Sequence, residues 1–252
     1  MITQWSLVIF TVFSQLATGL ALFSWWKDSR DHERHTRAAW KLAAVCALAA
    51  LIASAVDACG LAQGPLLTAQ TGCLLLFAGA AAAVRKPVCG LVALLAGTIC
   101  VLSQALAAVP GSLLSVSGVF PFALFLFCTI ALGASFSQLV RLGEPEDPAV
   151  RCGRFALPLR VSLWLMLILT ALAPCIVWDD PFMRRSAFFW MQTQLYWMGV
   201  IFSGVVIGLA HMGRVTLNVQ ALVAFVSVFG LRTAFYADSV HGAIDLSTLY
   251  MH

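Results

Sequence analysis

The sequence predicts an all-α integral membrane protein, an eight-transmembrane-helix bundle that forms a single polytopic domain over residues 1–252. Of its residues 61% are apolar and only 10% are charged, whereas a soluble domain carries about 25% charged residues. The charged residues gather in segments between long apolar runs. This composition excludes a soluble globular domain. The placement of the basic residues between apolar runs excludes a nucleic-acid-binding surface.

The first apolar run, 5–26, contains no charged residue and carries Trp at both ends. At about 1.5 Å per residue it is roughly 33 Å long, enough to cross a bilayer core of about 30 Å. It is too long for a secretory signal peptide, and the basic residues follow it instead of preceding it. We therefore predict an uncleaved transmembrane helix whose C-terminal end faces the cytoplasm.

Seven further apolar runs follow, and their order predicts that both termini lie on the outer, periplasmic side of a bacterial inner membrane. With eight spans, twelve of the fifteen Lys and Arg residues fall on connections that face the cytoplasm, as the positive-inside rule requires. The short connections favour antiparallel neighbours in an up-and-down bundle. The predicted spans are about 5–26, 40–58, 66–84, 88–109, 118–140, 157–178, 186–210 and 216–236.

Small and aromatic residues indicate how the spans pack. Gly204 and Gly208 are four residues apart in the seventh span, a spacing that lets a neighbouring helix approach closely. Most Trp residues fall near the predicted membrane interfaces, as in an aromatic belt. Trp164 and Trp197 lie deeper, so we expect these two to be available for lining a pocket.

The first span also carries a polar stripe. Thr11, Ser14, Gln15 and Thr18 follow the helical spacing i, i+3, i+4 and i+7, so they share one face. Gln15 falls close to the middle of the membrane. Two interpretations are open: hydrogen bonds to neighbouring helices, or the lining of a polar site.

Several classes of cofactor site are excluded by the residues available. The eight Cys residues form no C-x-x-C pair, which argues against zinc or iron–sulfur ligation. No His lies in the middle of a span, so this chain has no axial ligand for a membrane haem. We expect no metal bound by this chain. Cys59 and Cys73, near the outer ends of neighbouring helices, are a possible disulfide pair.

Polar residues gather near the outer ends of several spans, where a quinol headgroup would find partners for its two hydroxyls. Asp57 closes the second span, and a partly buried carboxylate is suited to accept a quinol proton. Arg232 lies about one turn inside the membrane edge and can hold a ring oxygen by a charge-assisted hydrogen bond. Asp57 as a helix cap and Arg232 as a side chain that snorkels to the headgroups are the alternatives. The other candidate quinol-binding residues are Gln15, Gln104, Gln194, Phe235 and Tyr236.

Three segments resemble the dimethyl sulfoxide reductase membrane-anchor (DmsC) family. The first is Trp5 with the run 9–13 and Gln15. The second is 53–57, in which Asp57 stands where the family has a His implicated in menaquinol binding. The third is Arg232-x-x-Phe235-Tyr236, similar to the family's last-helix pattern, although Leu231 replaces a Gly and Val228 stands where an acid is common.

This resemblance implies a membrane-anchor subunit of a DMSO-reductase-type molybdoenzyme complex that serves anaerobic respiration. Such a subunit binds no haem, takes menaquinol from the membrane pool as its substrate and oxidises it. It passes the electrons to a ferredoxin-like iron–sulfur subunit, and from there they reach a molybdopterin catalytic subunit. The anchor itself is otherwise non-catalytic.

Two other functions stay open on the sequence. A small-solute transporter or permease would need a polar site near the midplane and usually broken helices or paired repeats, and Gln15 is the feature that points to it. A purely structural membrane anchor would hold its partners without touching quinol. In that case Asp57 and Arg232 would be replaceable with no loss of electron flow.

Overall fold

A computed structural model describes residues 2–27, 33–58, 65–83, 87–107, 116–140, 148–176, 181–212 and 217–238. Throughout these ranges the regular secondary structure is helical, which confirms the all-α prediction. The elements are α1 (Ile2–Lys27), α2 (Glu33–Ala58), α3 (Pro65–Ala82), α4 (Pro87–Ala107), α5 (Val116–Val140), α6 (Pro148–Leu172), the short 3-10 helix η2 (Ala173–Cys175), α7 (Pro181–Gln192), α8 (Gln194–Met212) and α9 (Leu217–Asp238).

Seven of the described helices are long and apolar enough to cross a membrane, namely α1, α2, α4, α5, α6, α8 and α9. The chain is therefore a multi-pass membrane protein. The predicted span 66–84 corresponds to α3, whose described apolar stretch Ala69–Ala82 is shorter than the others. The 18 residues of α3 extend about 27 Å, slightly less than a typical bilayer core.

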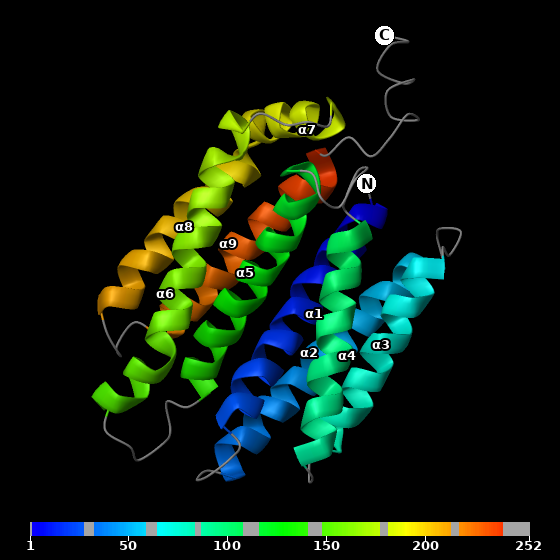
Figure 1. The fold of residues 1–252 in the computed structure, drawn as a ribbon, viewed down its shortest axis with the longest axis vertical. Coiled ribbons are helices and arrows are strands. Elements are labelled where there is room, and N and C mark those ends of the chain that lie inside the picture. Colours follow the sequence, from blue (N-terminus) through cyan, green and yellow to red (C-terminus); the bar gives the residue numbers. More distant parts are fainter. Residues whose placement is uncertain are drawn as a thin grey trace.

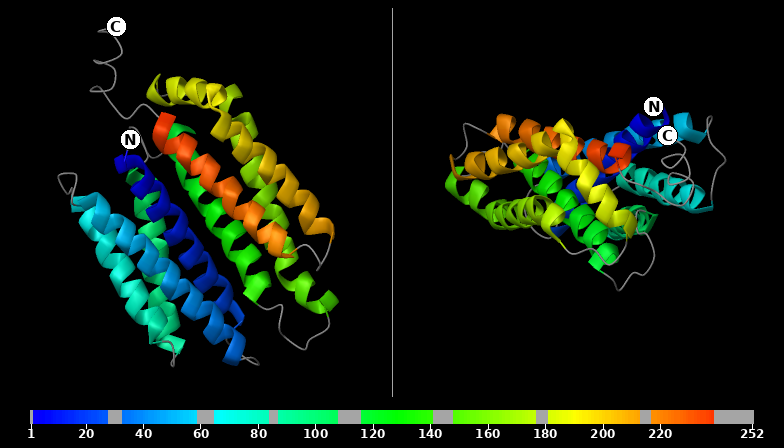
Figure 2. Two further views of the ribbon diagram at one scale, coloured as in Figure 1. Left: turned by 180° about the vertical axis from the view of Figure 1, so that it is seen from behind. Right: turned by 90° about the horizontal axis from the view of Figure 1, so that it is seen from above.

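The long helices run alternately up and down, as the short connections predict (Figure 1). Helices α1–α4 form one group, and α5, α6, α8 and α9 form the other (Figures 1 and 2). Helix α1 joins the groups, because it packs against α5 and α9 as well as α2 and α4. It is also the most deeply buried of the spans. The first turn of α1 and the last turn of α9 lie at the end of the bundle that carries α7, which we call the α7 end.

The predicted seventh span, 186–210, is wrong as one continuous helix. Helix α7 ends at Gln192 and lies across the bundle, whereas α8 begins at Gln194 and runs along it (Figure 1). Hydrogen bonds hold the corner: the Thr193 N–H donates to the Trp190 carbonyl at 3.1 Å, and the Trp197 indole N–H donates to the Met191 carbonyl at 2.7 Å. The apolar and polar residues of α7 form separate faces, which suits a helix that lies along the bundle end.

Helices α1 and α5 approach each other closely at two glycines. A Cβ atom added at Gly19 would lie 2.3 Å from the Thr129 carbonyl oxygen, and one added at Gly133 would lie 2.4 Å from the Gly19 carbonyl carbon. Only Gly permits backbones to approach this closely. This crossing fixes the register between α1 and α5.

Two expectations about packing within the chain are wrong. Gly204 and Gly208 lie on an exposed face of α8, with no atom of the described chain within 4 Å of an added Cβ. Trp164 and Trp197 are 49% and 42% exposed and face outward. A residue's depth along a helix does not determine the side on which it lies, so depth alone could not assign these Trp residues to a pocket.

Candidate functional site

Arg232 on α9 is fully buried, with 0% of its side chain exposed. Its guanidinium carbon lies 3.5 Å from the centroid of the Phe125 ring on α5. The Cys128 thiol and the Tyr236 hydroxyl are its polar neighbours. None of the three guanidinium nitrogens makes a hydrogen bond of ordinary geometry to any described residue. The site therefore holds a buried cation whose nearest acceptor is the weak Cys128 thiol and whose donors make no strong hydrogen bond to a described residue.

This placement decides between the two interpretations of Arg232. A snorkelling Arg extends its head towards the lipid headgroups and keeps it wet. The Arg232 side chain instead lies inside the bundle, against the α5 side chains Phe125 and Cys128. The snorkelling alternative is excluded, and the ionisable group is an interior one, which is typical of a functional position in a membrane protein.

Gln15 on α1 faces the same turn of α5. Helices α1 and α5 run in parallel (Figure 1), and Gly19 meets Thr129 and Gly133. Gln15 lies one turn before Gly19 on the same face, so the helical register places it beside the preceding α5 turn, which contains Phe125 and Cys128. Gln15 is 0% exposed, and neither its amide nitrogen nor its amide oxygen has a hydrogen-bond partner in the described chain.

The other polar residues of the α1 stripe are satisfied within the protein. The Thr11 hydroxyl donates to the Val8 carbonyl at 3.0 Å, and the Thr18 hydroxyl donates to the Ser14 carbonyl at 2.9 Å. The Gln104 amide on α4 donates to the Ser14 hydroxyl at 2.7 Å. Hydrogen bonding between helices thus accounts for Ser14 and for the Gln104 amide nitrogen, while the Gln104 amide oxygen and both polar atoms of the Gln15 amide have no partner in the described chain. The structure places Gln104 on the α4 side of α1.

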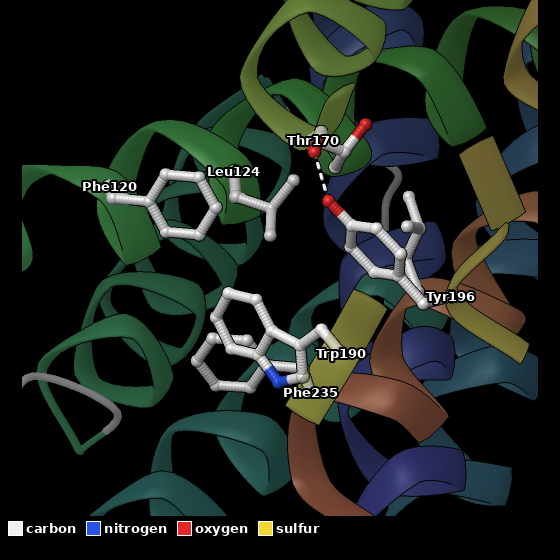
Figure 3. Close-up of a pocket in the computed structure, with 7 residues that line it drawn as sticks. Phe120, Leu124, Thr170, Trp190, Tyr196 and Phe235 are labelled. Atoms are coloured by element: carbon white, nitrogen blue, oxygen red, sulfur yellow. Dashed lines mark hydrogen bonds between the residues drawn. The ribbon is translucent and has the colours of Figure 1, made fainter. Parts of the chain in front are cut away.

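An aromatic pocket is lined by side chains of α5, α6, α7, α8 and α9 (Figure 3). Its cavity volume is about 10 Å³, room for about one water molecule, within about 230 Å³ of unfilled space that includes the open mouth. Trp190 lies over Phe235 with ring centroids 5.4 Å apart, and the Tyr196 hydroxyl donates to the Thr170 carbonyl. The lining residues are Phe120, Leu124, Thr170, Trp190, Tyr196, Leu231 and Phe235. The break between α7 and α8 creates this pocket, because it brings Trp190 and Tyr196 together over the bundle.

One layer of aromatic rings separates the pocket from the guanidinium group. The Phe125 ring contacts Arg232 on one side and lies 6.2 Å from the Phe235 ring on another. Phe235 also contacts Tyr236 edge-on at 5.5 Å. The predicted residues Arg232, Phe235 and Tyr236 therefore belong to one cluster, and Phe235 links the buried cation to the pocket.

Two predicted residues lie elsewhere. Gln194 is exposed at the start of α8 and does not line the pocket. Asp57 belongs to the last turn of α2, at the α7 end (Figure 1), but its side chain lies outside the described residues. Helix α2 packs mainly against α1 and α3. Whether Cys59 and Cys73 pair is a question that also lies outside the described part, because Cys59 does.

Sequence reasoning missed the contributions of Phe125, Cys128, Phe120 and Trp190. The first three are apolar or weakly polar residues in the apolar helix α5, where nothing distinguishes them from their neighbours. Trp190 was assigned to the interface by its position. A signal for it existed, since the sequence Asp179-Asp180-Pro181 is typical of a helix start and indicates a new helix before the seventh span.

The site as described combines a buried cation without a strong hydrogen-bond acceptor, an unpartnered amide at the same depth and an adjoining aromatic pocket. Such a set suits an aromatic ligand that carries oxygen atoms. Within the described residues no group of three or more His, Cys, Asp or Glu side chains is placed to hold a metal ion. Comparison with known proteins found no matching family model, no matching curated protein and no matching solved structure.

Proposed function

We propose that this chain is the menaquinol-oxidising membrane-anchor subunit of a DMSO-reductase-type molybdoenzyme complex. The observation that carries the proposal is the buried Arg232 guanidinium, which has no strong hydrogen-bond acceptor among the described residues and an aromatic pocket one ring layer away. A buried donor without an acceptor costs about 1–3 kcal/mol, and more when it is charged. A ligand oxygen placed at Arg232 removes that cost, so ligand binding is favoured at this point of the bundle.

A quinol fits both parts of the site. Its ring is planar, aromatic and apolar, and it packs well against rings such as Phe235 and Trp190. Its oxygen atoms stand at opposite edges of the ring. For one of them to reach Arg232 while the ring lies against Trp190, the Phe235 side chain between them has to rotate aside and widen the pocket. The isoprenoid tail remains in the lipid. Tyr236 supplies a further hydroxyl beside Arg232, and Gln104 and Gln194 stay predicted contacts.

Oxidation of the quinol releases two protons and two electrons. In the proposal Asp57, at the α7 end of α2, accepts a proton, and the electrons leave through a ferredoxin-like iron–sulfur subunit docked at this end. That subunit passes them to a molybdopterin subunit. Twelve of the fifteen basic residues fall in the connections at the opposite end of the bundle, which supports the α7 end as the periplasmic side of a bacterial inner membrane.

A small-solute transporter is less well supported. Transporter sites are commonly built from helices that break near the midplane. In the described chain the break in the predicted spans lies at Thr193, at the end of the bundle (Figure 1). The free amide of Gln15 is accounted for equally by a quinol oxygen. A purely structural anchor leaves the buried Arg232 without a reason, since an apolar residue would pack there at lower cost.

The test is quinol-dependent reduction of the acceptor in membranes that contain the whole complex. Arg232→Leu and Asp57→Asn are compared with the wild type at equal complex assembly, and Arg184→Leu serves as the control for loss of a basic residue at the same end. We expect both site variants to lose at least about tenfold in activity and the control to retain it. Full activity in Arg232→Leu and Asp57→Asn, with the partners bound, would support the structural anchor instead.

A further inference from the structure

The predicted spans contain one acidic residue, Asp57 at the end of the second span, and no guanidinium nitrogen of Arg232 has a strong hydrogen-bond partner among the described residues. The sequence contains no Asp or Glu in 1–27, 34–56, 59–143, 148–178 or 181–237. Asp238 is six residues beyond Arg232 on α9, which turns it about 240° away around the helix and about 9 Å along it. Asp57 belongs to α2, which packs mainly against α1 and α3.

An isolated buried cation is far more costly than a buried neutral donor, because the low-dielectric surroundings leave its charge unscreened. The face of the Phe125 ring compensates in part. A neutral quinol would satisfy the guanidinium hydrogen-bond donors but would leave the charge itself uncompensated. An anionic oxygen would satisfy the hydrogen-bond donors and also compensate the charge.

From this we infer that the Arg232 site binds its ligand as an oxygen anion, held jointly by the Arg232 guanidinium and the Gln15 amide. The inference rests on the proposed function and specifies its ligand: the form bound is the quinolate. On binding, one quinol O–H bond breaks, the electron pair stays on the oxygen, and the proton passes to Asp57 or to water at the α7 end. The quinolate then gives two electrons to the iron–sulfur partner and releases its second proton.

Gln15 is the second group that binds the oxygen anion, because it faces the same turn of α5 as Arg232 does. It faces the α5 turn that carries Phe125 and Cys128, and Arg232 lies against those same two side chains. The Gln15 NH₂ group is a donor without a partner. Two donors from two helices, one of them charged, form a site that prefers an anionic acceptor over a neutral one of the same shape.

Two naphthoquinones of similar shape test this directly. 2-Hydroxy-1,4-naphthoquinone is an anion at neutral pH, whereas 2-methoxy-1,4-naphthoquinone is neutral. Their dissociation constants are measured on the full-length chain in lipid nanodiscs by quenching of Trp fluorescence. We expect the anion to bind the wild type at least about tenfold more tightly than the neutral compound. We expect that ratio to fall to about one in Arg232→Gln and to decrease in Gln15→Leu.

The controls separate the possible failures. Arg184→Gln removes an exposed positive charge at the same end and should leave the ratio unchanged, which excludes a general attraction of anions to the surface. Arg232→Lys keeps a cation and should keep a preference for the anion. Equal binding of the two compounds to the wild type would overturn the anion inference and leave the proposed function standing. Failure of both compounds to bind would overturn both.

Discussion

The guanidinium carbon of Arg232 lies 3.5 Å from the centroid of the Phe125 ring, and both side chains are fully buried. This pair joins α9 to α5 at the point where the chain places a charge inside the bundle. A cation over an aromatic face is stabilised by about 2 kcal/mol when water is excluded. The contact therefore accounts for part of how the protein tolerates a lone buried guanidinium.

Replacement of Phe125 should weaken the fold through this contact. We expect Phe125→Leu to destabilise the protein by about 2 kcal/mol, and Phe127→Leu, in a partly buried position of the same helix, to cost less. A double-mutant cycle with Arg232→Gln, measured by unfolding of the purified protein in detergent, should give a coupling energy of about 1–2 kcal/mol. A coupling near zero would show that the ring does not stabilise the cation.

The glycine crossing of α1 and α5 should tolerate no side chain. In Gly19→Ala the new methyl group would meet backbone atoms of Thr129 and Gly133, which cannot rotate away. We expect a loss of about 2 kcal/mol or more and a lower yield of folded protein. Gly204→Ala is the matched control, because its Cβ would meet open space, and it should be neutral or stabilising by up to about 1 kcal/mol. Equal stability of the two variants would contradict the observed crossing.

The free amide of Gln15 should matter for quinol turnover. Gln15→Leu removes one of the two proposed donors to the ligand oxygen, so we expect turnover with menaquinol to fall about tenfold. The control is Gln220→Leu, which removes another buried glutamine amide, one that donates to the Gln138 side chain at 3.1 Å. That variant should lose some stability and keep its turnover. Unchanged turnover in Gln15→Leu would remove Gln15 from the site.

The sequence predicted the features that depend on composition and on the spacing of apolar residues. Length and hydropathy identified the spans, and Arg232 was recognisable because a charged residue is conspicuous in an apolar run. Phe125 was not recognisable, because a Phe in an apolar helix looks the same whether it faces lipid or a guanidinium group. The contact between Phe125 and Arg232 joins residues more than a hundred positions apart, and a single sequence holds no record of such pairing.

Hydropathy also failed to find the corner at Thr193. Hydropathy averaged along the sequence merges the end of α7 with α8, since both contain large hydrophobic side chains. The helix-start signal at Pro181 and the polar residues Gln192 and Gln194 indicate the corner, but they are local signals that an average over a span conceals. The aromatic pocket depends on this corner, so hydropathy alone could not predict the pocket.

The direction of the chain across the membrane is open to a labelling test. Single cysteines at Arg184 and His211, in a variant without the native Cys residues, occupy exposed positions at opposite ends of the bundle. We expect a membrane-impermeant maleimide to label Arg184→Cys in intact cells and His211→Cys only after permeabilisation, as the distribution of basic residues requires. The reverse pattern would place the α7 end in the cytoplasm and move the proposed partner docking to that side.

Trp190 should determine how tightly the pocket holds the quinol ring. Its ring packs on Phe235 at 5.4 Å and stacks beside Tyr196 at 6.3 Å, so it forms one wall of the pocket. Trp190→Leu removes an aromatic contact with the ligand of about 0.5–1.5 kcal/mol and loosens the wall. We expect the KM for menaquinol to rise several-fold, while kcat changes little because Arg232 and Gln15 are untouched. Trp164→Leu, at a position that is 49% exposed, is the matched control and should leave KM unchanged. A KM that rises equally in both variants would mean that Trp190 acts through the lipid-facing surface and that the pocket does not hold the ring.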